Sequence, residues 1–388
     1  MAFTIQQKNY QKDNLTFVSN TNNITEPAAE EFQSIIDLYA QRRIQEALSL
    51  ISEMQLEYPN SAFLCDFAGA CNAELMNFDQ AIADYKMAIN LRPNFSDAYN
   101  NLGNVHLKMG DLIKAIQSYS QAIKIEPSYG IAHFNLANAK LDNFDFKGAI
   151  ESFKLAIEFD QGNDLAHYLL ANLLREEGNL DEAIECYKKA LKINPEYADA
   201  FNNLGNAIQA KTQIDNGDLD EAIECYKKAL KINPEYAQAF NNLGNAIQVK
   251  TQIDNGDLDE AIECYKKALK INPEYAEAYN NLGSVLKLNG HLNKAIVNFK
   301  KAISINSNFS DAYNNLGTVL LEKGILNEAI LCFKQAININ PRDSVAFYNM
   351  GNANLSNGDS ELAIENFKKS IMINPNYEEA ITMLKKIN

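Results

Sequence analysis

The feature that most constrains this chain is a Leu-Gly pair, or a close substitute for it, that returns at a fixed distance along the sequence. The distance is 34 residues, except for two steps of 39 residues. A period of this length is typical of two-helix units that stack on one another as a solenoid. The copies of the pair are Leu102-Gly103, Leu136-Ala137, Leu170-Ala171, Leu204-Gly205, Leu243-Gly244, Leu282-Gly283, Leu316-Gly317 and Met350-Gly351.

Each unit carries two apolar stripes at helical spacing. In one unit, Leu102 and Leu107 belong to the first stripe, and Ala115 and Tyr119 belong to the second. Two stripes of this kind predict two amphipathic helices. The small residues Gly103 and Ala115 should allow the two helices to approach closely.

Asn-Pro pairs separate many of the units, as at Asn194-Pro195 and Asn340-Pro341. Proline has no N–H to donate and disfavours a helical conformation in the residue before it, so these pairs should end the second helix. The columns of one complete unit are Tyr99, Leu102, Gly103, His106, Ala115, Tyr119, Ala122 and Pro127. This pattern resembles the tetratricopeptide repeat column by column, over about residues 28–388.

The resemblance implies an all-α fold, a right-handed superhelical solenoid of tetratricopeptide helix-turn-helix repeats. Residues 28–377 would form about ten repeats, and residues 378–388 would form a capping helix over the last open face. Residues 1–27 are rich in Asn, Thr and Gln and show no helical period, so we expect them to be disordered.

Two central units, residues 198–236 and 237–275, are nearly identical and resemble a tandem duplication. They differ only at Asp199 against Gln238 and at Ala210 against Val249, and each is five residues longer than its neighbours. We expect the extra residues to lengthen the end of the first helix without rewinding the core. They form either a functional ridge or a tolerated insertion.

Composition narrows the classes of partner. The formal net charge is −15, which argues against nucleic acid and anionic membranes because phosphate binding relies on clustered Lys and Arg. The start of the chain lacks the pattern of a signal peptide, and no run of 18 apolar residues occurs, which predicts a soluble, cytoplasmic protein without membrane insertion. The six cysteines show no CxxC pairing and are interpreted as small buried hydrophobes.

Asparagine recurs directly before and after the Leu-Gly pair. In tetratricopeptide proteins these columns lie on the first helices, which line the concave groove, so the resemblance places an asparagine ladder there. The predicted peptide-binding residues are Asn100, Asn101, Asn104, Asn135, Asn138, Asn172, Asn202, Asn203, Asn206, Asn241, Asn242, Asn245, Asn280, Asn281, Asn314, Asn315, Asn349 and Asn352.

A row of amides can hold the backbone of an extended peptide, because each amide offers donors and an acceptor whatever the peptide's side chains are. The alternative is that some of these asparagines only join neighbouring helices. The ladder is similar to the one in the repeat region of O-linked N-acetylglucosamine transferases. Nearby acidic residues favour a neutral to basic partner; they are Asp97, Asp199, Glu277 and Asp311.

The sequence carries no motif for a nucleophile, a metal or a phosphate group, so we expect a non-enzymatic scaffold without cofactor or metal. His106, His133 and His167 stand in packing columns, and His291 stands in a turn. Two alternatives stay open. The chain could be the recruiting arm of, or a relative of, a protein glycosyltransferase that lacks its catalytic domain, or it could self-associate through the ends of the solenoid.

Overall fold

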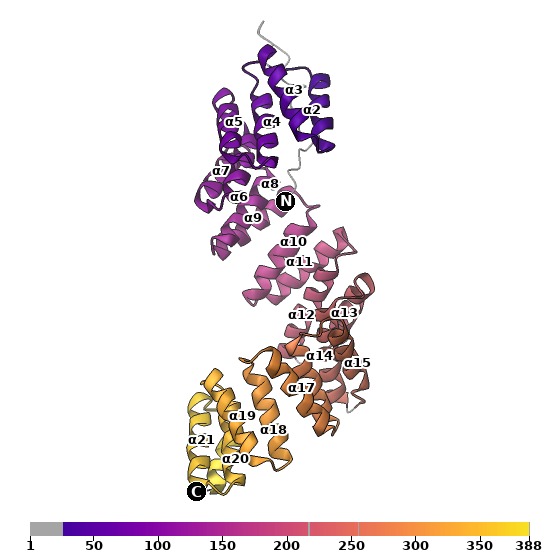
Figure 1. Ribbon diagram of the computed structural model, residues 1–388, viewed down its shortest axis with the longest axis vertical. Helices are drawn as coiled ribbons and strands as arrows, with labels where there is room; N and C mark the ends of the chain where they lie inside the picture. Colours follow the sequence, from indigo (N-terminus) through magenta and orange to yellow (C-terminus); the bar gives the residue numbers. More distant parts are fainter. Residues whose placement is uncertain (1–25, 216–217, 255, 388) are drawn as a thin grey trace. The chain divides into compact units, whose positions relative to one another are not determined.

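The computed structural model describes residues 26–215, 218–254 and 256–387, and it confirms the predicted all-α architecture of paired helices. Figure 1 shows the helices, which alternate between a first and a second helix of each pair. The expected disorder of residues 1–27 falls almost entirely on residues outside the described ranges. The boundaries of single repeats remain a prediction from the period.

The chain divides into two units, each described by itself, and the first ends at Asn179. Its helices are α2 (Ala29–Ala40), α3 (Ile44–Glu57), α4 (Ala62–Glu74), α5 (Phe78–Leu91), α6 (Ser96–Lys108), α7 (Leu112–Ile125), α8 (Gly130–Asp142), α9 (Phe146–Phe159) and α10 (Asp164–Glu176). Even-numbered helices are first helices, and odd-numbered helices are second helices.

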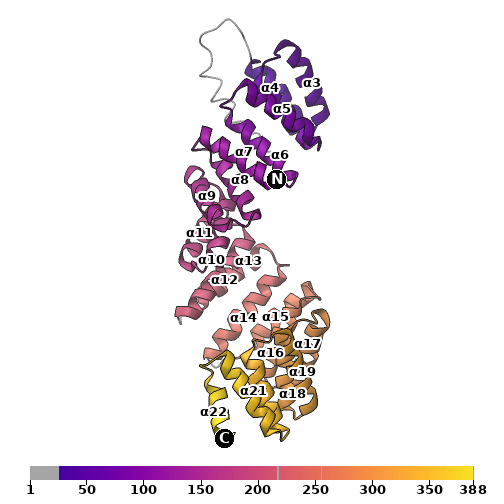
Figure 2. The same cartoon turned by 90° about the vertical axis from the view of Figure 1, so that its left-hand side faces the viewer.

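The second unit begins at Leu180. Its helices are α11 (Leu180–Ile193), α12 (Ala198–Asp215), α13 (Asp220–Ile232), α14 (Ala237–Asp254), α15 (Asp259–Ile271), α16 (Ala276–Leu288), α17 (Leu292–Ile305), α18 (Ser310–Glu322), α19 (Leu326–Ile339), α20 (Ser344–Ser356), α21 (Ser360–Ile373) and α22 (Glu378–Ile387). The last of these, α22, packs beside α21 at the end of the chain (Figure 2).

The turn inside a pair is set by local chemistry. After α6, Gly110 has a φ of 79°, a left-handed conformation that glycine adopts without a steric penalty. Asp111 then accepts a hydrogen bond from the backbone N–H of Lys114 at 3.2 Å and caps α7. The sequence thus ends one helix and begins the next within three residues.

The two helices of a pair meet at a glycine. A Cβ at Gly103 would lie 2.6 Å from Cε1 of Tyr119, and one at Gly317 would lie 2.7 Å from Cε1 of Phe333. Both rings are fully buried. The predicted close approach of the helices is therefore confirmed, and it leaves no room for a side chain at these glycines.

The five extra residues of the central units lengthen the first helix, as predicted. Helices α12 and α14 each have 18 residues, against 13 for α16. The added turns carry Lys211, which forms an ion pair with Asp181, and Lys250, which forms one with Asp220. Each insertion therefore fastens its helix to the preceding second helix.

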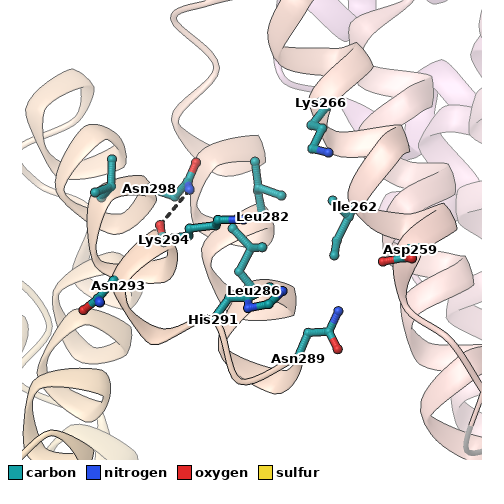
Figure 3. A pocket seen from close by; sticks show the side chains of 11 residues that line it. Asp259, Ile262, Lys266, Leu282, Leu286, Asn289, His291, Asn293, Lys294 and Asn298 are labelled. Atoms are coloured by element: carbon teal, nitrogen blue, oxygen red, sulfur yellow. Dashed lines mark hydrogen bonds between the residues drawn. The ribbon is translucent and has the colours of Figure 1, made fainter.

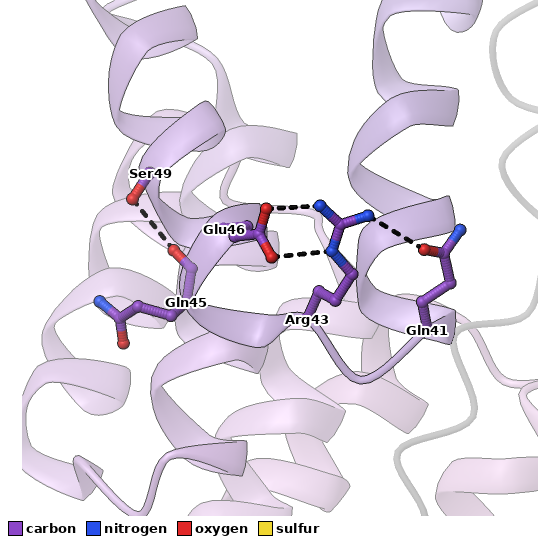
Figure 4. A network of polar contacts seen from close by, with 5 residues as sticks. All are labelled: Gln41, Arg43, Gln45, Glu46 and Ser49. Atoms are coloured by element: carbon purple, nitrogen blue, oxygen red, sulfur yellow. Dashed lines mark hydrogen bonds and ion pairs between the residues drawn. The ribbon is translucent and has the colours of Figure 1, made fainter.

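The first pair closes its turn without a glycine, as do the pairs α4–α5 and α8–α9, where Met76 and Phe144 have φ near 60°. Arg42, between α2 and α3, has a φ of 62° although it is not a glycine. Arg43 follows and binds both carboxylate oxygens of Glu46, at 2.7 and 2.5 Å, and the side chain of Gln41 at 3.3 Å (Figure 4). Side-chain contacts of the neighbouring Arg43 stabilise this turn.

Candidate peptide-binding face

The predicted asparagines lie on the first helices, and successive first helices contact one another from α4 to α8 and from α12 to α20. We call the residue two before the Leu-Gly pair the first position, the residue directly before it the second position, and the residue directly after it the third position. In one repeat these are Asn100, Asn101 and Asn104.

Second-position amides donate to first-position residues of the preceding repeat. Asn135 Nδ2 donates to Asn100 Oδ1 at 2.9 Å, and Asn242 Nδ2 donates to Asn202 Oδ1 at 3.0 Å. The same bond, at 3.0 Å, joins Asn281 to Asn241, Asn315 to Asn280 and Asn349 to Asn314. The asparagines thus form a regular hydrogen-bonded ladder between neighbouring helices.

First-position asparagines are more deeply buried than the second-position asparagines that bond to them. Asn202 is fully buried, and Asn100 is 4% exposed. Asn241 and Asn280 are also buried, and Asn314 is half-buried. Buried amides must satisfy their hydrogen bonds within the protein, so these residues chiefly join the helices.

Second-position asparagines are more accessible and keep part of their hydrogen-bonding capacity. Asn242, Asn315 and Asn349 are half-buried, and the Oδ1 of each has no partner among the residues that the structure describes. An amide has two N–H donors, of which the ladder uses one. Asn101, Asn203 and Asn281 are likewise half-buried, whereas Asn135 is buried.

Third-position asparagines serve the second helix of their own pair. Tyr119 donates its hydroxyl proton to Asn104 Oδ1 at 2.8 Å. Tyr226 and Tyr265 do the same to Asn206 and Asn245, at 2.8 and 2.7 Å. Asn138 instead donates to the carbonyl of Phe134, and Asn172 and Asn352 are half-buried on α10 and α20.

The ladder begins at a residue that sequence reasoning missed. Asn101 Nδ2 lies 3.2 and 3.4 Å from the two carboxylate oxygens of Asp66 on α4. Asp66 stands one 34-residue period before Asn100, in the first position, so the period itself could have identified it. A carboxylate can accept the ladder bond as an amide oxygen does, but it adds a negative charge.

Acidic residues lie along the same helix faces as the second-position amides. Asp97 precedes Asn101 by one helical turn, and Asp311 precedes Asn315 in the same way, so each pair shares a face. Asp97 is half-buried and accepts a hydrogen bond from the hydroxyl of Tyr129. Asp199, Glu277 and Asp311 are exposed.

Asp66 has an unusual environment for a carboxylic acid. Burial, and after it the negative charge of Asp97, raise the pKa of the Asp66 carboxyl to about 7, although the hydrogen bond from Asn101 lowers it. The amide of Asn101 and the carboxyls of Asp66 and Asp97 therefore make this part of the face sensitive to the protonation of Asp66.

Other reactive side chains are held within the packing. His106, His133 and His167 are buried, and burial raises the pKa of the Cys225 and Cys264 thiols to about 11. The described ranges contain no group of three or more His, Cys, Asp or Glu side chains that could hold a metal ion. In the same ranges, every helix is too short or too polar to span a lipid bilayer.

Family models of the tetratricopeptide repeat match most of the chain. One, described as a TPR repeat, matches residues 77–110, 171–211, 210–248, 252–290 and 317–358. Three others, described as tetratricopeptide repeats, match residues 96–129, 276–309 and 344–377, residues 298–330, and residues 131–163. The similarity to the transferase repeat region rests on the asparagine columns alone. No curated protein sequence matches the chain.

Solved structures of repeat proteins are similar to parts of the chain. YrrB, described as a TPR protein with an unusual peptide-binding site, is 28% identical over 52% of this chain and 99% of its own, with a TM-score of 0.40. A TPR-containing protein from Cytophaga hutchinsonii is 19% identical over 65% of this chain and 99% of its own, with a TM-score of 0.54. One from Parabacteroides merdae is 19% identical over 66% and 98%, with a TM-score of 0.51.

Proposed function

We propose that this chain, which belongs to the tetratricopeptide repeat family, is a scaffold. It binds extended peptide segments of partner proteins along its asparagine ladder. The observation that carries this proposal is the unused hydrogen-bonding capacity of the second-position amides. Asn242, Asn315 and Asn349 each offer one N–H and one oxygen at the surface.

The chemistry of these amides suits a peptide backbone. A peptide contributes one N–H and one C=O for nearly every residue, and an amide side chain can bind either group. Each bond contributes only about 0.5–1.5 kcal/mol net, but several along one face would reach micromolar affinity, about 8 kcal/mol.

Charge sets the preferred partner. Asp199, Glu277 and Asp311 are exposed one turn before second-position amides, and they attract Lys and Arg side chains of a bound peptide. The partner is therefore a neutral to basic segment. A glutamate-rich peptide of the same length should bind more weakly, and increasingly so at low salt.

The test replaces four second-position residues by alanine, at Asn203, Asn242, Asn281 and Asn315. We expect the circular-dichroism spectrum to stay helical while binding of a lysine-containing peptide array is lost. The matched control replaces the third-position Asn206 and Asn245, which removes two tyrosine bonds but leaves the second positions intact. Equal loss of binding in both variants would show that stability, and not ligand contact, is responsible.

A second candidate use of the same face is substrate recruitment for a separate catalytic subunit, which the asparagine columns favour through their similarity to transferase repeats. Purification of the chain with its natural partners distinguishes the two. A glycosyltransferase held in stoichiometric amount, and released by the second-position variant, would identify a recruiting arm.

A further inference from the structure

At three places in the second unit a lysine joins the end of a first helix to the start of the preceding second helix. Lys211 binds Asp181, Lys250 binds Asp220, and Lys323 binds Asn293. In each case the lysine stands seven residues after the leucine of the Leu-Gly pair, near the end of a first helix, and its partner begins the preceding second helix. We call these three residues the bridging lysines.

The junction of α15 with α16 lacks this bridge, as does that of α19 with α20, where Asn357 and Asn327 hold the two places. At the junction of α15 with α16 the corresponding residue is Asn289, directly after α16, and the corresponding partner is Asp259. Asp259 is exposed, and its carboxylate has no hydrogen bond or ion pair with any residue in the described ranges. A carboxylate that binds an ammonium group in the two preceding repeats is therefore left open here.

A pocket of about 550 Å³ opens at this junction (Figure 3). Leu282 and Leu286 of α16 and Ile262 of α15 supply buried apolar side chains, and Val297 of α17, 67% exposed, supplies an accessible one. The polar lining residues are Asp259, Lys266, Asn289, His291, Asn293, Lys294 and Asn298. No asparagine of the ladder lines the pocket, so it is separate from the proposed peptide-binding face.

The charges of the lining indicate how a ligand would be oriented. Figure 3 shows Asp259 across the pocket from Asn289 and His291, and Lys266 farther along α15. Lys266 is paired with Glu263 at 2.6 Å, which offsets its charge. Lys294 is the remaining cation, and it stands on the opposite wall, on α17. The end of the pocket at Asp259 therefore favours a cation, and the apolar part favours an aliphatic group.

We propose that this pocket is a second docking site, which binds a partner protein through a lysine whose ammonium group reaches Asp259 and an adjacent aliphatic residue that covers Leu286 and Val297. The bridging lysines show the same recognition inside the chain, because Lys211 and Lys250 bind the equivalent aspartates. The ligand class is a segment in which lysine neighbours leucine, isoleucine or valine.

The experiment follows the methyl groups of Ile262, Leu286 and Val297 by NMR in the full chain. The probe is the capped dipeptide acetyl-lysyl-leucine amide, and acetyl-glutaminyl-leucine amide is the uncharged control. We expect saturable shifts at these methyls with the lysine probe and weaker shifts with the control. Equal shifts with both probes, or none with either, would overturn the proposal.

Two variants test the role of the missing bridge. Asn289→Lys should close the pocket and abolish the shifts, and lysine suits this position because Lys323 occupies the equivalent position directly after α18. Lys250→Asn should open the preceding junction and produce new shifts at Ile223 and Ile247. Binding that persists in Asn289→Lys contradicts the proposal. Neither variant touches the ladder, so failure here leaves the proposed peptide-binding face unaffected.

Discussion

The two units use the same helix pair, but among the residues that the structure describes only the first unit closes some of its turns with a non-glycine residue of positive φ. In the second unit, Gly290, Gly324 and Gly358 have φ between 74° and 84°. In the first unit, Gly110 holds the equivalent place in one turn, whereas Met76 and Phe144 hold it in two others with φ near 60°, where a side chain is strained. The Phe144 side chain is also 80% exposed. The fold therefore tolerates a strained turn, because close helix contacts and not the turn residues determine the pair.

The hydrogen-bonded ladder is also more uniform in the second unit than in the first. In the second unit, asparagine meets asparagine in four consecutive bonds. In the first unit, one of the two bonds ends on the acid Asp66. The first unit thus combines strained turns with a half-buried carboxyl in its ladder, while the second unit repeats one neutral asparagine–asparagine bond.

The largest expected effect comes from the contact that both units share. Gly317→Leu in the second unit and Gly103→Leu in the first should each lower the free energy of unfolding by about 1–3 kcal/mol, because the new side chain meets a buried ring. Urea denaturation measures both. A loss in only one variant would show that the units differ in packing as well as in turns.

The next effect concerns Asp66. A pKa raised above the unfolded value means that the folded state binds the proton more tightly, so the stability contributed by this group falls as pH rises from about 4 to about 7. Asp66→Asn keeps an acceptor for Asn101 and removes the charge. We expect it to be more stable than the wild type by about 1–2 kcal/mol at pH 8, and nearly equal to it at pH 4.

Denaturation at both pH values checks this prediction. Asp311→Asn, in the second unit, removes an exposed carboxylate and serves as the control with no comparable gain. If Asp66→Asn showed the same advantage at both pH values, its effect would not come from titration.

The smallest expected effect concerns the turns. Phe144→Gly should stabilise the chain by about 0.5–1 kcal/mol, because it relieves the left-handed strain and removes an exposed aromatic side chain. The reciprocal change, Gly324→Phe, should destabilise it by about 1–2 kcal/mol. Thermal unfolding of both variants measures the pair. A destabilised Phe144→Gly would mean that the contact of Phe144 with Phe146 matters more than the strain.

Much of the fold could be predicted from the sequence because period and apolar spacing act locally. The Leu-Gly pair fixed the place where the helices meet, and the extra residues of 198–236 had to lengthen a helix whose partner kept its spacing. The roles of single asparagines could not be predicted in this way. Asn101 and Asn104 look alike in sequence, yet one bonds to the preceding repeat and the other to a tyrosine of its own pair.

That Asp259 is unpaired could not be predicted from the sequence either. The repeat carries the same aspartate in three neighbouring copies, and only the position of Lys211 and Lys250 at the ends of lengthened helices shows that two of them are occupied. The interaction joins residues thirty apart, so no short motif contains both partners.

The direction of the ladder bonds has a consequence for how such a chain can grow. Every donor reaches back toward the amino-terminal side, and every repeat with the full motif offers the same acceptor to the next. Asn281 meets Asn241 as Asn242 meets Asn202, at 3.0 Å in both cases. A gene segment that encodes one whole repeat can therefore be duplicated in place. The added repeat donates a ladder bond to the repeat before it and accepts one from the repeat after it, so no amide loses its partner.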